Sequence, residues 1–198
     1  MESFLRTVVF IGLVAVSTCQ VISISKGCPA VNVQQNFSIA EYMGRWYEMD
    51  RFFAIFEAFQ DCVSAEYTLQ SGGTVIVNNT GYSHKFWSRG YNNAIGDAIV
   101  EDPRTPAKLG VRFSPDQPRG DYWVLSTDYT SYTVIWSCKE LLSLGPFGKL
   151  TAQFAWILTR RPEGISARKR ERLIQLMEGY GINTAKFSAT NQNNCPGR

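Results

Sequence analysis

The sequence predicts an all-β protein, an eight-stranded antiparallel up-and-down barrel with one C-terminal α-helix packed outside it. Eight apolar or alternating segments follow one another, and short turns rich in glycine, proline and aspartate separate them. One amphipathic stretch of helical periodicity follows the last of these segments. An up-and-down barrel leaves no exposed sheet edge, and eight strands enclose space for one small ligand.

Local signals bound the predicted strands. Ser38 is a suitable N-cap for a short helical turn that ends at Tyr42, just before the first strand. Later turns are predicted at 71–73, 102–103, 114–116 and 128–130. The predicted strands span 44–51, 63–70, 74–82, 87–99, 107–114, 121–128, 131–138 and 152–160.

The predicted helix spans residues 166–180. Its apolar side chains fall on one face, and Gly181 is a typical residue to end it. These side chains are Leu173, Leu176, Met177 and Tyr180. We expect this face to pack against the outside of the barrel, and we predict a last short strand at 182–187.

The start of the chain has the pattern of a secretory signal peptide. A polar segment at 1–6 precedes an apolar run at 7–16, and small residues follow. The run is too short for an uncleaved membrane anchor, which needs about 20 residues. We expect cleavage after Cys19, with Thr18, Ser23 and Ser25 as alternative sites. The signal peptide then covers 1–19, and a single secreted, extracellular domain covers 20–198.

The cysteine content fits an extracellular protein. Loss of Cys19 leaves four of the five cysteines, and four cysteines allow three pairings. Since His84 is the single histidine, we predict neither a metal site nor a Ser-His-Asp triad, and no phosphate-binding glycine loop occurs. The formal net charge of +3 is too small to indicate a nucleic-acid partner. We therefore expect neither an enzyme nor a cofactor.

Three motifs resemble the signature regions of the lipocalin family. Gly44 and Trp46 open the first strand, Thr127 and Asp128 lie at the end of the sixth, and Arg160 ends the last. The resemblance implies that Trp46 lies at the closed end of the barrel, with Arg160 over its ring in a cation–π contact. It also implies that Thr127 and Asp128 form a tight turn at that end. We expect these five residues to be structural rather than ligand contacts.

Further segments are similar to the apolipoprotein D group of lipocalins, which includes Lazarillo and bilin-binding proteins. These segments are 26–29, 44–48, 106–109, 122–129, 154–158 and 194–196. The resemblance implies a carrier of a small lipophilic ligand, a fatty acid, sterol or retinoid, or alternatively of a pigment such as biliverdin or a carotenoid. It also implies two disulfides, Cys28–Cys138 and Cys62–Cys195, which attach the terminal arms to the barrel wall.

The ligand pocket is predicted from the alternation of side chains along strands. Arg160 reaches under the barrel floor, so Trp156 and Phe154 are expected to face inward. Cys138 faces outward to meet the N-terminal arm, which turns Ile135 inward. The expected ligand contacts are Tyr67, Val77, Asn79, Val111, Phe113, Ile135, Ser137, Phe154 and Trp156. This mostly apolar wall suits an apolar ligand; in the alternative, aromatic side chains fill the barrel completely.

The connection at 52–60 is unusually apolar for a loop because it carries four phenylalanines. We expect Phe52 and Phe59 to be the less exposed members because they adjoin strands. The predicted barrel-mouth residues are Phe53, Phe56, Leu142 and Phe147, with further apolar side chains in loops at 86–87 and 139–151. Such a rim could dock on a membrane, a lipoprotein or a cell-surface receptor. The alternative from another class is a protein-interaction function of this rim around a filled barrel.

Two surface features complete the sequence analysis. Asn36 and Asn78 each begin an Asn-x-Ser/Thr sequence, the acceptor for glycosylation in secreted proteins. A basic run at 168–172 opens the predicted helix, and we expect it to be mainly a solvated face.

Overall fold

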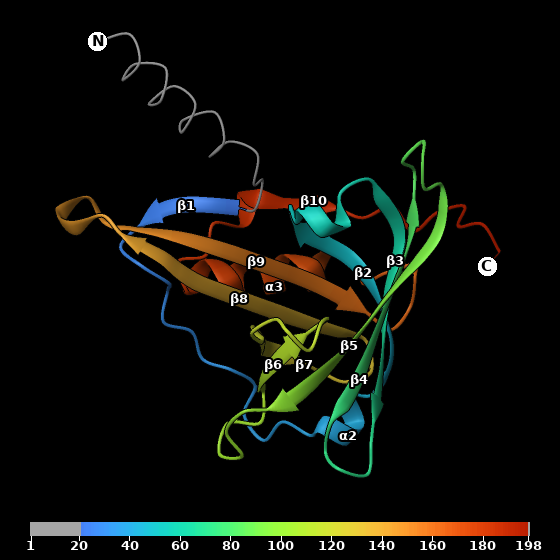
Figure 1. Cartoon of the computed structure of the whole chain (residues 1–198), viewed down its shortest axis with the longest axis horizontal. Helices are drawn as coiled ribbons and strands as arrows, with labels where there is room; N and C mark the ends of the chain where they lie inside the picture. Colours follow the sequence, from blue (N-terminus) through green and yellow to red (C-terminus); the bar gives the residue numbers. More distant parts are fainter. Residues whose placement is uncertain (1–20, 198) are drawn as a thin grey trace, which may run out of the picture.

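The computed structural model describes residues 21–197, so the predicted signal peptide at 1–19 lies outside the described residues. Within that range eight antiparallel strands form a closed barrel, as predicted (Figure 1). Strands adjacent in sequence pair with each other, and the last pairs with the first, with Tyr47 opposite Thr159. The barrel strands are β2 (Gly44–Phe52), β3 (Gln60–Leu69), β4 (Val75–Ser83), β5 (Gly90–Val100), β6 (Lys108–Arg112), β7 (Gly120–Thr127), β8 (Tyr132–Ser143) and β9 (Lys149–Thr159).

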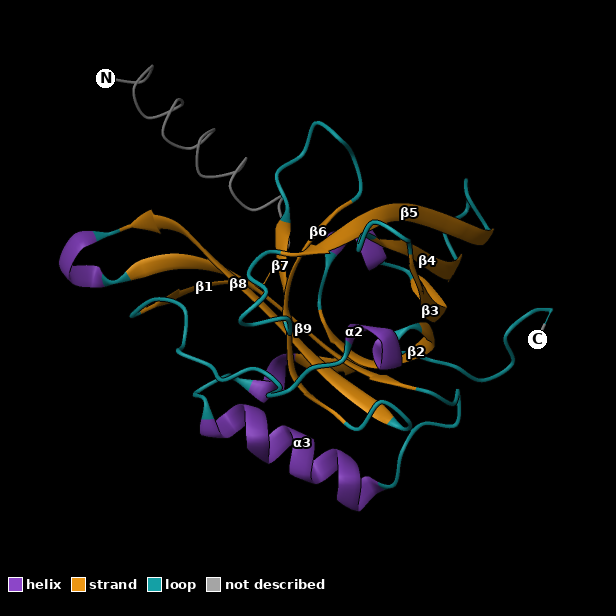
Figure 2. Ribbon diagram, turned by 90° about the horizontal axis from the view of Figure 1, so that it is seen from below, coloured by secondary structure: helices purple, strands orange, loops and turns teal. Residues whose placement is uncertain are grey.

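One short helix lies at an end of this barrel and one longer helix lies along its outside (Figure 2). The short helix α2 (Ile39–Tyr42) lies across one end of the ring of strands, and Ser38 caps it by accepting a hydrogen bond from the Glu41 N–H. The helix α3 (Ala167–Gly179) runs along the outside of the barrel. One end of the barrel is therefore covered and the other is left open.

Helix α3 attaches to the barrel through an apolar face and through ion pairs. Leu173 and Met177 are buried against the core, as predicted, and Ile174 packs beside them in place of Leu176. Arg170 makes two hydrogen bonds to the buried Asp50, at 2.8 and 2.7 Å. The run is largely exposed, as predicted, with the Arg170 side chain 46% exposed, but its pairing with Asp50 also helps to hold the helix in place.

Two further strands extend the sheet beyond the barrel. β1 (Val21–Ser25) pairs with the first half of β9, and β10 (Phe187–Ala189) pairs with the end of β2. The predicted strand at 182–187 is wrong in position, because Asn183 caps a 3₁₀-helix, η3 (Thr184–Lys186), and the strand starts only after it. No strand was predicted at β1, which overlaps the proposed cleavage sites at Ser23 and Ser25.

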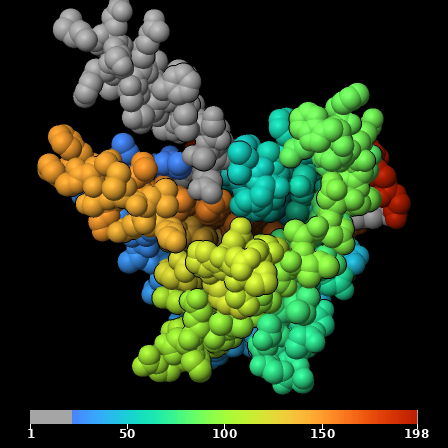
Figure 3. Space-filling model, in the orientation of Figure 1, coloured from blue at the N-terminus to red at the C-terminus, as the bar shows by residue number. Residues whose placement is uncertain are grey.

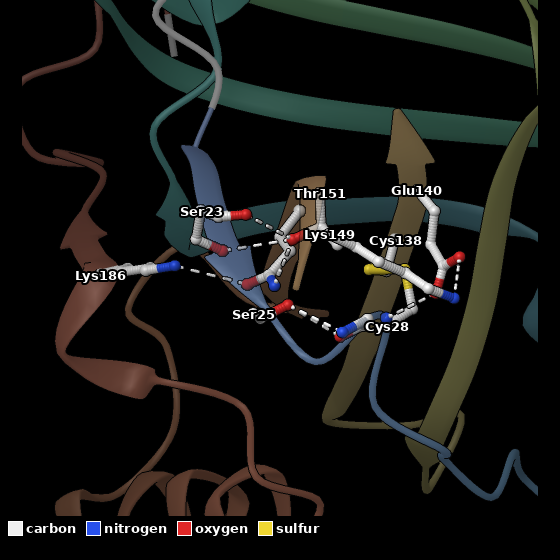
Figure 4. The surroundings of a disulfide bond; sticks show 10 residues. Ser23, Ser25, Cys28, Cys138, Glu140, Lys149, Thr151 and Lys186 are labelled. Carbon is white, nitrogen blue, oxygen red and sulfur yellow. Dashed lines mark hydrogen bonds and ion pairs between the residues drawn. A yellow bond between two sulfur atoms is a disulfide. The ribbon is translucent and has the colours of Figure 1, made fainter. Parts of the chain in front are cut away.

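Both disulfides join a terminal arm to the barrel wall. They are Cys28–Cys138 and Cys62–Cys195, and they link residues 110 and 133 positions apart. Figure 4 shows polar contacts around the first bond: Lys149 bridges to Glu140 at 2.7 Å, and Glu140 accepts a hydrogen bond from the Cys28 N–H. Closing such long loops restricts the unfolded chain and stabilises the fold.

The hairpin of β8 and β9 is longer than predicted and extends past the barrel (Figure 1). Leu141 and Leu142 therefore lie in a strand, and only a 3₁₀-helix, η2 (Gly145–Phe147), makes the tip. Pairing of β1 with β9 supports this extension. β7 pairs with β8 only as far as Trp136, so the rest of β8 pairs with β9 alone.

Candidate functional site: an internal cavity

The barrel encloses a cavity of about 760 Å³. All nine side chains that alternation predicted to face inward line it: Tyr67, Val77, Asn79, Val111, Phe113, Ile135, Ser137, Phe154 and Trp156. Its volume falls within the range of small-molecule pockets, about 300–1,000 Å³. The aromatic side chains therefore do not fill the barrel, and the alternative of a filled interior is wrong.

One wall of the cavity is aromatic. Phe154 and Trp156 alternate with outward-facing residues of β9, and their rings stack with centroids 5.9 Å apart. Phe56 lies 6.0 Å from Phe154, so the aromatic surface continues to the mouth. Stacked and tilted rings of this kind present flat apolar surface to a ligand.

Three tyrosines bring hydroxyl groups to the floor of the cavity. The Tyr122 hydroxyl lies 2.9 Å from those of both Tyr42 and Tyr67, and the Tyr42 hydroxyl lies 3.1 Å from Thr133 Oγ1. Burial raises the pKa of Tyr42 to about 12, and it raises the pKa of Tyr67 and Tyr122 as well. All three hydroxyls thus keep their protons at physiological pH and offer hydrogen bonds deep in an apolar space.

Two buried carboxyl groups, those of Glu48 and Glu57, line the cavity. Glu57, on the 3₁₀-helix η1 (Ile55–Glu57), accepts a hydrogen bond of 3.2 Å from the Trp156 indole. Glu48 of β2 pairs with Arg51 at 2.6 Å. Arg51 also donates to the backbone oxygens of Glu57 and Gln60, which fixes η1 over the cavity. Burial, with a further contribution from the charge of Glu48, raises the pKa of Glu57 to about 8.

The connection between β2 and β3 exposes three of its four phenylalanines. Phe53, Phe56 and Phe59 are 43%, 56% and 73% exposed, whereas Phe52 is 1% exposed. The expectation that Phe59 is among the less exposed members is wrong, because it adopts a left-handed backbone (φ 64°) at the turn into β3. Phe56 is both exposed and part of the cavity wall.

Three apolar segments lie near the open end. Besides the β2–β3 connection, Phe86 and Trp87 are exposed between β4 and β5, and Leu142 and Phe147 are exposed on the β8–β9 hairpin. Figure 3 shows these segments in teal, green and orange along the upper and left margins of one view. The predicted mouth residues thus all present apolar surface to solvent.

Trp46 and Arg160 lie together at the closed end of the barrel. Trp46 is fully buried, and the Arg160 guanidinium lies 3.7 Å from the centroid of its ring. Arg160 also donates to four backbone oxygens, those of Tyr129, Arg45, Glu41 and Tyr42. Gly44 has a φ of +90°, and a Cβ there would meet Arg160 Nη1 at 3.3 Å. A side chain at position 44 would therefore be strained and crowd the arginine.

The turn between β7 and β8 is held by Asp128 at the same end. Its Oδ1 accepts hydrogen bonds from the backbone N–H groups of Thr130, Ser131 and Tyr132, and its Oδ2 lies 3.2 Å from Lys169 Nζ. Partial burial raises the pKa of Asp128, but these hydrogen bonds outweigh that effect and bring it to about 2. The neighbouring Thr127 hydroxyl accepts a hydrogen bond from the Tyr129 N–H and donates to the Tyr132 carbonyl.

The two candidate glycosylation sites lie outside the cavity. Asn36 is exposed in the segment before α2. Asn78 is half-buried, and its side-chain oxygen accepts a hydrogen bond from Asn93 on the neighbouring strand. Within residues 21–197, no cluster of histidine, cysteine, aspartate or glutamate has the arrangement of a metal site, and no helix is long and apolar enough to cross a membrane.

Sequence reasoning missed several cavity residues. The most consequential are Tyr42, Glu48, Glu57 and Tyr122. Tyr122 could have been found, because it shares a face of β7 with the apolar Val124. Tyr42 and Glu57 lie on short helical segments, where strand alternation gives no direction. A lone acid in a phenylalanine-rich loop was the available signal for Glu57.

Comparisons with known proteins agree with this architecture. The lipocalin-like domain family matches residues 37–192. The chain is 35% identical over 169 residues to apolipoprotein D of Mus musculus, which is 85% of this chain and 84% of that protein. It is 29% identical to the Lazarillo protein of Schistocerca americana over 84% of this chain and 75% of that one. Lobster apocrustacyanin A1 shares the fold, with a TM-score of 0.72 at 20% identity over 87% of this chain and 93% of that structure. The chain therefore belongs to the lipocalins, a family of binding and transport proteins.

Proposed function

We propose that this protein is an extracellular carrier that holds one small lipophilic molecule inside its barrel. The observation that supports the proposal most strongly is the cavity of about 760 Å³, with a mostly apolar and aromatic wall and a covered floor. Desolvation of apolar surface supplies most of the affinity in such a site. The tyrosine hydroxyls of the floor and the carboxyl of Glu57 near the mouth supply the few polar contacts that orient a ligand.

The ligand classes that fit are those of moderate size and low polarity, namely sterols, retinoids and fatty acids. Light absorption distinguishes a pigment, such as biliverdin or a carotenoid, from a colourless lipid. If the ligand is a pigment, protein purified from its native tissue will absorb light at wavelengths where tyrosine and tryptophan do not. Mass spectrometry of the extracted ligand would identify either class.

Tryptophan emission provides the direct test of binding in the cavity. Titration with an apolar ligand such as retinol is expected to quench or shift the emission of Trp156, because its ring lines the cavity. Trp156→Phe should remove most of that signal, whereas Trp87→Phe, at an exposed position between β4 and β5, should keep it. An unchanged signal in Trp156→Phe would place the ligand elsewhere and contradict the proposal.

We further propose that the apolar mouth contacts a membrane or lipoprotein while the ligand is exchanged. Burial of one phenylalanine in an apolar phase contributes roughly 2–3 kcal/mol, so two inserted rings give weak, reversible attachment. Phe53 and Phe59 are the residues to test, because Phe56 also lines the cavity and its loss would disturb ligand binding directly.

The experiment replaces Phe53 and Phe59 together by serine. Binding to lipid vesicles and transfer of ligand to them should fall strongly, and the affinity for a soluble ligand should stay within a few fold. Vesicle binding that survives the double substitution would show that this rim does not dock. A cell-surface receptor would remain a partner only if binding to cells required the same two rings.

Secretion and glycosylation are also part of the proposed function. The disulfides fit an oxidising compartment, and the two acceptors, the exposed Asn36 and the half-buried Asn78, lie outside the cavity. Expression of the full chain in a eukaryotic secretory host should yield medium-borne protein that starts near residue 20. Enzymatic removal of N-glycans should then reduce its mass, and the double substitution Asn36→Gln and Asn78→Gln should abolish that reduction.

A further inference from the structure

The charged groups around the cavity are unevenly distributed. Among the described residues that line it, three are acidic, Glu48, Glu57 and Asp121, and one is basic, Arg112. The Arg112 guanidinium is committed to Asp97, at 2.9 Å. Asp121 lies near Lys139 and Lys108, whose charges partly offset the effect of burial on its pKa. A ligand carboxylate would therefore meet no uncommitted cation in the described wall.

Glu57 is the buried acidic group of this described wall that forms no ion pair, whereas the other buried acid, Glu48, pairs with Arg51. Glu57 is 9% exposed and lines the cavity from η1. The hydrogen bond from the Trp156 indole reaches one of its two carboxyl oxygens, Oε2. The nearest cation, Arg51, pairs with Glu48 and with the backbone of η1 rather than with the Glu57 carboxyl. Among residues 21–197 the second oxygen, Oε1, has no hydrogen-bond partner, so it can meet the polar end of a ligand.

Burial, aided by the charge of Glu48, keeps Glu57 protonated at neutral pH. Glu48 and Arg51 face it from β2, Trp156 contacts it from β9, and its own charge acts on Tyr67 of β3. Burial and the negative charge of Glu48 raise its pKa to about 8, against the opposing effects of Arg51 and the indole hydrogen bond. The group changes from a neutral acid to a carboxylate in a mildly alkaline range.

We propose that Glu57 selects the head group of the ligand, so that the cavity prefers amphiphiles with an amine or an uncharged polar end over those with a carboxylate. This inference rests on the proposed carrier function. An ammonium group would form an ion pair with Glu57 and displace its proton. A hydroxyl group would exchange hydrogen bonds with the neutral acid. A carboxylate would require Glu57 to stay protonated, and two carboxylates in this space would repel each other.

Three probes that share the same saturated tail and differ only in the head group separate these cases: myristylamine, myristyl alcohol and myristate. Their binding is measured by isothermal titration calorimetry below their aggregation concentrations, at about pH 7 and about pH 9. Because Glu57 ionises within this interval, the affinity for the amine should rise about tenfold and that for the carboxylate should fall about tenfold. The affinity for the alcohol should change by less than about twofold.

Proton exchange gives an independent readout. At about pH 8, titration in two buffers of different ionisation enthalpy should reveal release of about half a proton on amine binding and uptake of about half a proton on myristate binding. Glu57→Gln keeps the acceptor for Trp156 but cannot ionise, so both proton exchanges and the opposite pH trends should disappear. Glu163→Gln removes one acid at an exposed position outside the cavity and should behave like the parent protein.

The outcomes separate the two proposals. Saturable binding of all three probes, with the same pH dependence in the parent and in Glu57→Gln, would overturn head-group selection and leave the carrier function standing. Preferred binding of myristate at about pH 9 would also overturn it. Absence of saturable binding for all three probes would overturn the carrier function and head-group selection together.

Discussion

At the closed end of the barrel Arg160 and Asp128 are each held by several hydrogen bonds, whereas at the open end three of the four phenylalanines of the β2–β3 connection face solvent. The charged groups of Arg160 and Asp128 at the closed end thus find their hydrogen-bond partners within the fold. The mouth carries exposed apolar rings near two buried acids, Glu48 and Glu57. Both features lower the stability of the fold, and both are typical of a binding site. Stability and binding are therefore expected to depend on opposite ends of the molecule.

The largest expected effect belongs to the closed end. Arg160→Ala removes the cation–π contact with Trp46 and leaves backbone carbonyls without their donor, so it should lower the free energy of unfolding by about 2–4 kcal/mol. Urea denaturation measures this change, and Arg161→Ala, at the exposed neighbouring position, is the control. Ligand affinity should be unchanged while the protein is folded. A variant that unfolds like the parent but loses binding would remove the distinction between the two ends.

A smaller effect, with a defined pH dependence, is expected at Asp128. Its folded-state pKa of about 2 lies below the value of an unfolded aspartate, about 3.9, so the stabilisation is full above that value and disappears as the pH falls toward 2. Because the side chain is one-third exposed, we expect Asp128→Asn to cost only about 1–2 kcal/mol at neutral pH. Free energies of unfolding measured between neutral pH and pH of about 2 should converge for parent and variant. A constant difference across this range would show that charge is not the cause.

The smallest effect on stability is expected at the mouth. Phe59→Ser replaces a ring that is 73% exposed and should change the free energy of unfolding by less than about 0.5 kcal/mol. Phe52→Ser, at the buried end of the same connection, is the matched control and should cost several times more. Thermal unfolding of the two variants side by side tests the comparison. A large loss of stability in Phe59→Ser would mean that its ring packs into the fold in solution.

The difference between the two ends also explains what could be predicted. The closed end is built from short motifs around Gly44, Trp46 and Arg160, whose spacing is visible in the sequence. The cavity wall follows from strand alternation, because one residue of known direction, such as Cys138, fixes its whole strand. The barrel and the inward side chains were therefore accessible from sequence.

The mouth was less accessible because its geometry depends on non-local contacts and unusual backbone conformations. Phe59 points outward because of a left-handed φ that no apolar pattern reveals. Glu57 is oriented by Arg51, which binds the backbone of η1. The long β8–β9 hairpin depends on pairing with β1, a segment more than 120 residues away in the chain that lies beside the predicted signal peptide.

The most direct test of the central claim is to fill the cavity. Val77→Trp introduces a large ring on the inner face of β4, and Ile76→Trp places the same ring on the outer face of that strand. Both variants are titrated with retinol, and their folding is checked by circular dichroism. We predict that Ile76→Trp binds like the parent and that folded Val77→Trp shows no saturable binding. Parent-like affinity in folded Val77→Trp would contradict binding inside the barrel.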